Sequence, residues 1–301
     1  MADTTLRVAD DVRALVHAHA GKPAAGSPAA AECDGDPFRG EWGGPSMAVV
    51  GSLMLSATAC HDHLRAASIL VRSRAVTFSP HTVIRGAAEA AALGSYLADP
   101  DADQRERVRR GVNVRLAGLC QERLALRRFA GPEPGAAAKI VGIEQALGRF
   151  ERSASAHGFA FAAPDGFKPA YLDAKTPSAT ELLARYVFPG AATLGRAYYS
   201  GLSSVAHSQL NGLMRKVISD GAGSAQVNAA AKDTALELLA GPLAASTLVQ
   251  FMVPWLGWDA TALNASIPAM LDQWGRIADA PYPGPVSGGA PPPMPPVRET
   301  G

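Results

Sequence analysis

Apolar residues recur every three or four positions along most of this chain, and they seldom alternate with polar residues as they would along a half-buried strand. The clearest case runs from Met47 to Arg74, where Val50, Leu53 and Ala57 share one helical face. The same spacing predicts helices over residues 3–19, 47–74, 80–98, 100–129, 136–155, 178–188 and 198–217, and shorter pieces over 229–240, 243–253 and 260–278. We therefore expect an all-α protein, a single helical-bundle domain of about eight or nine helices.

Local start signals support several of these helices. Ser79 followed by Pro80 is typical of an N-cap and a first helical position, and Asp99 with Pro100 repeats that signal. Ser178 has Glu181 three residues later, which is the spacing of a capping box. These signals place helix starts near 80, 100 and 179.

Composition divides the chain into three parts. Residues 1–45 combine a short amphipathic helix with a Gly-, Pro- and Ala-rich stretch that we expect to be a mobile connection, although Phe38 and Trp42 could hold part of it in place. Residues 46–278 form the expected helical domain, and residues 279–301 a disordered Pro-rich tail. Hydrophobic residues make up 48% of the chain but aromatic ones only 6%, which favours closely packed helices over sheets.

Charge and cysteine content exclude several classes of protein. The net charge is +1, so only a local basic patch could bind a polyanion. Three widely spaced cysteines without a C-x-x-C pair indicate neither a disulfide framework nor a zinc knuckle, and with no signal-peptide pattern they favour the cytoplasm.

The uncharged stretch 238–258 contains Pro242, Gln250 and Pro254, so we expect a buried core helix and no membrane span. The chain also lacks the P-loop, dinucleotide-binding and H-E-x-x-H motifs, and we expect no cofactor and no metal.

Ser203 and His207 lie on one stripe of the predicted 198–217 helix, together with Leu210 and Met214. An imidazole on such a stripe points inward or into a cleft, where it is either a general acid or base or a hydrogen-bonded core residue. Ser203 lies one turn earlier and could share a hydrogen bond with His207, but it lacks the strained turn of a serine nucleophile.

Arg85 and Glu89 are spaced i, i+4 among alanines and a glycine, which predicts a helix seam. One interpretation is a buried salt bridge that fixes the packing of the helices. The other is a cleft in which Arg85 holds an anion and Glu89 orients His207.

The predicted 100–129 helix is rich in arginine. Arg109, Arg123 and Arg127 fall on one stripe, which is the arrangement of a phosphate-binding face and also of a solvated surface whose arginines pair with acids elsewhere. His61, Asp62 and His63 are three potential metal ligands in a row, but on a helix they point in different directions.

The chain as a whole resembles a group of uncharacterised all-helical actinobacterial proteins over about residues 47–260. The resemblance is carried by His61, by Val-Ile-Arg85-Gly-Ala-Ala-Glu89-Ala, by Leu97-Ala-Asp-Pro100 with Arg107 and Arg110, by Tyr199-Ser-Gly-Leu-Ser203-Ser-Val-Ala-His207 and by Leu256-Gly-Trp-Asp259. More remotely the chain is similar to HEPN-type helical domains, many of which act on RNA through an Arg four to six residues before a His on one helix. No Arg stands at that distance before His207.

These observations lead to three functional hypotheses. The first is an RNA-acting protein, ribonuclease-like or a transferase that uses aminoacyl-tRNA, in which His207 handles the proton, Glu89 orients it and Arg85 binds an anionic group. Its partners would be tRNA or another RNA, with a homodimer as a possible assembly. The second is an enzyme of specialised metabolism that binds a small-molecule substrate in the same pocket, and the third is a non-enzymatic interaction or regulatory protein.

Overall fold

The computed structural model describes residues 2–73, 78–129, 133–214, 217–219, 225–227 and 231–279, and it confirms the all-α class. Within these ranges the strands form two short antiparallel pairs, β1 (Phe161–Ala162) with β2 (Tyr171–Leu172) and β3 (Val217–Ser219) with β4 (Ala225–Val227). There are more helices than expected, because short helices join the long ones. The Pro-rich tail lies outside the described residues.

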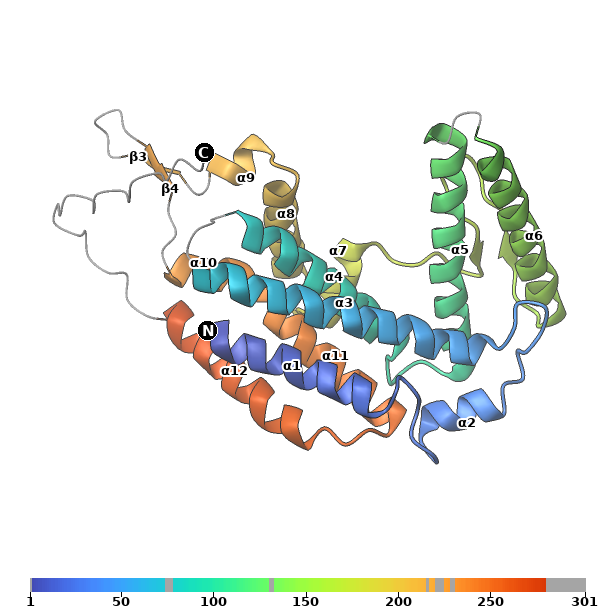
Figure 1. Ribbon diagram of the computed structural model, residues 1–301, viewed down its shortest axis with the longest axis horizontal. Helices are drawn as coiled ribbons and strands as arrows, with labels where there is room; N and C mark the ends of the chain where they lie inside the picture. The colour runs from blue at the N-terminus through green and yellow to red at the C-terminus, as the bar shows by residue number, and fades with distance from the viewer. Residues whose placement is uncertain are drawn as a thin grey trace, which may run out of the picture.

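A bundle of helices makes up the larger part of the molecule (Figure 1). Helix α4 packs between α3 and α11, while α1 lies between α3 and α12, and α7, α8 and α10 cover other parts of α4. The bundle helices are α1 (Ala2–Ala18), α3 (Pro45–Ser73), α4 (Ser79–Leu97), α7 (Ala179–Tyr186), α8 (Ala192–Ala206), α9 (Leu210–Met214), α10 (Ala231–Leu238), α11 (Ala240–Leu256) and α12 (Thr261–Asp279).

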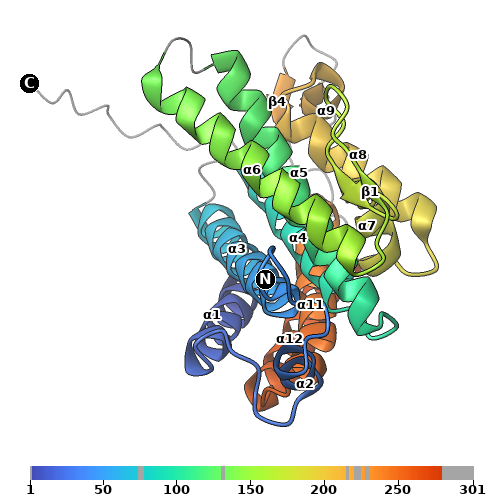
Figure 2. The ribbon, with the colours of Figure 1, turned by 90° about the vertical axis from the view of Figure 1, so that its right-hand side faces the viewer.

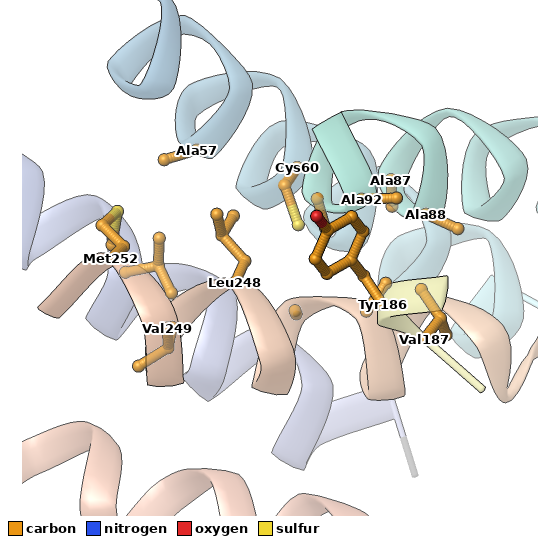
Figure 3. Packing of buried hydrophobic residues seen from close by; sticks show 14 of the residues in the cluster. Ala57, Cys60, Ala87, Ala88, Ala92, Tyr186, Val187, Leu248, Val249 and Met252 are labelled. Atoms are coloured by element: carbon orange, nitrogen blue, oxygen red, sulfur yellow. The ribbon is translucent and has the colours of Figure 1, made fainter. Parts of the chain in front are cut away.

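Small residues bring the central helices of this bundle close together (Figure 3). Ala87 and Ala88 of α4 are fully buried, and the Leu248 side chain of α11 rests directly on Gly94. A Cβ atom at Gly94 would lie 2.6 Å from Leu248 Cδ1, so a larger residue there would separate the helices. This explains how a chain with few aromatic residues fills a large core.

A second core lies in a hairpin that projects from the bundle (Figures 1 and 2). Helices α5 (Gln104–Phe129) and α6 (Pro134–Ala156) lie side by side, with β1 and β2 against them. Their shared apolar residues are Trp42, Val108, Val112, Leu116, Cys120, Ile143, Leu147, Phe150, Ala154, Phe159, Ala170 and Leu172. We call residues 104–177 the hairpin lobe. It meets the bundle where Gly111 of α5 touches Val49 of α3.

The stretch expected to be a mobile connection is packed against both cores, which corrects that expectation. It contains helix α2 (Pro28–Asp34), whose N-terminus is capped by Ser27 Oγ accepting from the Ala30 amide. Further along, Trp42 is only 6% exposed and its amide donates to Ser153 Oγ of α6. Alanine-rich sequence at this place therefore marks close packing.

One described stretch, Thr234–Leu256, is long and apolar enough to cross a membrane. It comprises most of α10 and all of α11, and 56% of its most apolar window is buried inside the protein. The side chains of Leu248 and Met252 belong to the bundle core, as expected for this segment from its sequence. The described residues thus do not form a multi-span membrane protein.

Candidate functional site

Helix α8 ends much earlier than its sequence pattern predicts. Its last residue is Ala206, and Ser208 takes up the left-handed conformation with φ of 52°. The Ser208 amide donates to the carbonyl of Val205 and the Gln209 amide to that of Ser204, which is the Schellman arrangement of a helix C-terminus. His207 is therefore the C-cap residue and does not belong to a continuous 198–217 helix.

This early end places His207 on the surface, so of the two expected orientations, inward or toward a cleft, the inward one is wrong. Its Nε2 lies 2.9 Å from Nη1 of Arg85 on α4. Ser203 is half-buried. It bonds His207 through the backbone, because the Ser203 carbonyl accepts from the His207 amide. Because α8 stops before the next turn is complete, the expected Ser203–His207 side-chain pair is not formed.

Arg85 is the centre of a four-residue polar cluster between α4 and the end of α8. Its Nε donates to Glu89 Oε1 at 2.7 Å, and its Nη2 donates to the Tyr199 hydroxyl at 3.1 Å. Tyr199 in turn donates to Glu89 Oε1 at 2.8 Å, so Arg85 separates Glu89 from His207. The sequence analysis did not count Tyr199 among the candidate site residues, although it lies one helical turn before Ser203 on the same stripe.

The protonation of the cluster follows from these bonds. A guanidinium group only donates, so His207 Nε2 is the acceptor in its contact with Arg85. Burial and the bond to Glu89 raise the pKa of Tyr199. Burial by itself disfavours the charge on Arg85, but the bonds to Glu89 and Tyr199 outweigh it and raise the Arg85 pKa. In this arrangement the cluster fastens the C-terminus of α8 to α4, and it engages His207 Nε2 and three of the five N–H donors of Arg85.

The arginines near the start of α5 are bound within the protein. Arg107 and Arg110 are 7% and 5% exposed, and both reach the segment between α4 and α5. Arg110 donates to Asp99 Oδ2 at 3.1 Å and to Glu106 Oε1 at 2.7 Å, while Arg107 donates to Glu32 Oε1 at 2.7 Å. We call Arg105, Arg107, Arg109 and Arg110 the proximal arginines.

Asp99 is the hub that holds this region together. It is 3% exposed and accepts bonds from Arg110, from the Tyr186 hydroxyl at 2.7 Å and from Arg185. Burial alone would raise its pKa, but the bonds from Tyr186 and Arg110 lower it below the usual range for aspartate. Asp99 thus joins the end of α4 to α5 and α7, whereas its sequence indicated an N-cap.

Arg109 is not part of an exposed phosphate-binding stripe, which corrects the grouping with Arg123 and Arg127. Its Nε donates to Glu106 Oε2 at 2.6 Å and its Nη1 to the Ala174 carbonyl at 2.7 Å. The Arg109 side chain is 12% exposed. It fastens the strand β2 region to α5 and is not accessible to a phosphate.

The arginines near the end of α5 have a different environment. Arg127 and Arg128 are exposed, and Arg123 is half-buried and has no hydrogen-bond or ion-pair partner among the residues that the structure describes. We call these three the distal arginines. Arg123 and Arg127, but not Arg128, line a cavity of about 80 Å³ between α5 and the loop before β2. We call it the cationic pocket, and its lining residues are Cys120, Gln121, Arg123, Leu124, Arg127, Gly166, Phe167, Lys168 and Pro169.

Charge is unevenly distributed between the two parts of the molecule. The hairpin lobe, residues 104–177, holds 13 Lys and Arg against 7 Asp and Glu, whereas the rest of the chain holds 15 against 20. The near-neutral total conceals this separation. The lobe is therefore basic and the rest of the chain acidic.

The histidines of α3 do not form a metal site. His61 is half-buried, and burial lowers its pKa, while His63 packs on Gly86 of α4. Across the described ranges no three His, Cys, Asp or Glu residues gather as metal ligands would.

Comparisons with known proteins add no relative: no family model, no curated protein and no solved structure matches this chain.

Proposed function

We propose that this protein binds RNA, and that the distal arginines of the hairpin lobe contact the phosphates. The observation that carries the proposal is the cationic pocket with its exposed cations, because surface arginines near aromatic rings are typical of nucleic-acid contacts. Lys168 adds a fourth charge from the loop that faces α5. The charge separation described above supports the same surface.

Exposed aromatic side chains lie beside these cations. Phe129 is 82% exposed at the end of α5, and Phe167 is 72% exposed in the loop before β2. The guanidinium of Arg128 lies 4.5 Å from the centre of the Phe167 ring. Unstacked RNA bases stack on such rings and on arginine planes, which gives affinity without a base-specific code.

The proposal is confined to binding. In the α4–α8 cluster the hydrogen bond from Arg85 occupies His207 Nε2, so the imidazole has no free basic nitrogen there. Proton transfer by His207, with cleavage or acyl transfer of RNA, would require that bond to open. The closed set of hydrogen bonds among Arg85, Glu89, Tyr199 and His207 supports a structural role for this cluster. A cytoplasmic location is part of the RNA-binding proposal.

A second candidate function is small-molecule binding, which a groove of about 590 Å³ favours. It lies between the α2–α3 loop and α5 and is lined by Arg39, Trp42, Met47 and Arg115 among others. Its volume is in the range of ligand pockets. The groove is not lined by Arg85, Glu89, Ser203 or His207, so such a function would not use the residues expected from the sequence.

Titration of a labelled single-stranded RNA, followed by fluorescence anisotropy over a salt series, tests the RNA proposal. Log affinity falls with log salt, and each lost phosphate contact makes that negative slope shallower by roughly 0.7, so Arg123→Ala/Arg127→Ala should reduce its magnitude by about 1.4. The matched control, Arg13→Ala/Arg276→Ala, removes two exposed arginines from α1 and α12 and should keep the wild-type slope. Absence of binding by the wild-type protein, or equal losses in both double variants, would refute the proposal.

A further inference from the structure

The cationic pocket is small. Its volume of about 80 Å³ lies well below the roughly 300–1,000 Å³ of pockets for drug-sized ligands, so it suits a small group such as a phosphate. The walls come from two sides, Cys120 to Arg127 of α5 and Gly166 to Pro169 of the facing loop. An internal phosphodiester needs an open groove because the strand continues on both sides, whereas a strand end enters a pocket of this size directly.

The loop that forms one wall is held firmly on α5. Asn113, which is 2% exposed, accepts from the Leu172 amide at 2.6 Å through Oδ1 and donates to the Ala174 carbonyl at 2.7 Å. Closer to the pocket, the Ala170 amide donates to Cys120 Sγ at 3.4 Å. The turn itself has Gly166 at φ of 56° and mutual backbone bonds between Asp165 and Lys168. The pocket is therefore preformed and loses little entropy on binding.

The charges of the pocket suit a dianion. Three of its lining residues are cationic, and the lining contains no carboxylate. Arg127 pairs with Glu144 at 2.7 Å and Lys168 with Asp165 at 3.4 Å, but both pairs are exposed and therefore weak. Arg123 has no ion-pair partner among the described residues. A terminal phosphomonoester carries a charge of about −1.5 to −2 at neutral pH, against −1 for an internal diester. The extra charge favours the terminal group.

The rim of the pocket offers a place for the nucleotide attached to that phosphate. Phe167 belongs to the lining, and its ring is largely exposed with Arg128 against it. When the phosphate occupies the pocket, the base attached to it lies at this rim and can stack on the Phe167 ring, against which Arg128 already packs.

We infer that the hairpin lobe binds the phosphomonoester end of an RNA strand, with the phosphate among Arg123, Arg127 and Lys168 and the terminal base on Phe167. This inference rests on the proposed RNA-binding function and specifies its ligand.

The test compares four forms of one short single-stranded RNA, with a 5′-phosphate, a 3′-phosphate, both phosphates or hydroxyl ends only. At least one singly phosphorylated form should bind about tenfold more tightly than the hydroxyl form, as expected for added charge-assisted hydrogen bonds. Arg123→Gln should abolish this difference, whereas Arg152→Gln, on the exposed face of α6, should keep it. Comparison of the 5′ and 3′ forms identifies the strand end.

The outcomes separate the two proposals. Equal binding of all four forms would overturn the inference and leave RNA binding intact, whereas no binding of any form would refute both. Titrations with inorganic phosphate and with a nucleoside monophosphate complete the test. If either binds as tightly as the phosphorylated RNA, the pocket serves small anions and the RNA-end inference is wrong.

Discussion

Two groups of arginines on the same helix have opposite environments. The proximal arginines of α5 are bound to carboxylates, backbone carbonyls and aromatic rings, and Arg107 and Arg110 are almost completely buried. About four to six turns further along, Arg127 and Arg128 are exposed and Arg123 has no partner among the described residues. Arg109 lies on the same helical stripe as Arg123 and Arg127 and is nevertheless bound within the protein, so neither residue type nor stripe determines the role.

The difference arises from the acids that the fold brings to each group. Glu32 comes from α2 and Asp99 from the segment after α4, and both lie where α5 crosses the bundle. The end of α5 projects beyond the bundle and meets mainly α6 and a short loop. Arg107 and Arg110 are structural because distant segments supply carboxylates that are themselves largely buried. The distant carboxylate that reaches Arg127, from Glu144, forms only an exposed pair, so Arg127 stays accessible to a ligand.

The largest effect should come from truncating a proximal arginine. Arg110→Ala leaves Asp99 buried without its main cation, and removal of one partner of a buried pair costs about 3–5 kcal/mol of unfolding free energy. Arg127→Ala removes an exposed pair with Glu144 and should cost less than about 1 kcal/mol. Urea denaturation of both variants measures the two losses of unfolding free energy. Similar losses would show that the proximal and distal arginines do not differ in role.

A smaller effect is expected from acid. The pKa of Asp99 is lowered in the folded protein, so its contribution to stability is complete above the ordinary aspartate pKa of about 3.9 and is lost as the pH falls through the folded value. Glu106 is shifted in the same direction by Arg109 and Arg110, although burial opposes the shift. Asp99→Asn should therefore be less stable than wild type at pH 7, and the gap should narrow below about pH 4. Denaturation at several pH values measures it, with Asp272→Asn as an exposed control. If the difference in unfolding free energy between wild type and Asp99→Asn stays constant with pH, the pKa of Asp99 is not lowered by folding.

The smallest effects belong to the α4–α8 cluster, whose burial is intermediate. Tyr199→Phe removes a hydroxyl that bonds both Glu89 and Arg85, and should cost about 1 kcal/mol. His207→Ala removes an exposed ring and should change stability by less than about 0.5 kcal/mol. Thermal unfolding of both variants checks this order. A loss of several kcal/mol for His207→Ala would mean that the imidazole is part of the structural core.

Much of the fold was predictable from the sequence, because helical periodicity and caps are local. The Ser178–Glu181 capping box is present as predicted, and the long apolar stripe of α3 is buried. The end of α8 was not predictable in the same way, since Ser208 is not a residue that usually marks a left-handed helix end. Because of this backbone conformation, His207 lies on the surface and not in the interior, which was one of its two expected positions.

The candidate site was predictable only in part. Arg85 and Glu89 form the expected i, i+4 pair, and Arg123 and Arg127 do line a common pocket. Lys168 and Phe167, however, reach that pocket from a loop about forty residues away in sequence, and no periodic pattern could place them there. The partners of Arg109 were hidden for the same reason, because the Ala174 carbonyl approaches only after β2 has docked on α5.

The most direct test of the RNA-binding surface is photo-crosslinking of a thiouridine-containing RNA to the full-length protein, followed by mass spectrometry of the linked peptides. We predict crosslinks in the peptides that contain Phe129 and Phe167, the exposed rings beside the distal arginines. The same peptides should lose their crosslinks in the Arg123→Ala/Arg127→Ala variant. Crosslinks confined to α8 and α9 around His207, or to the bundle face formed by α1 and α12, would contradict this account.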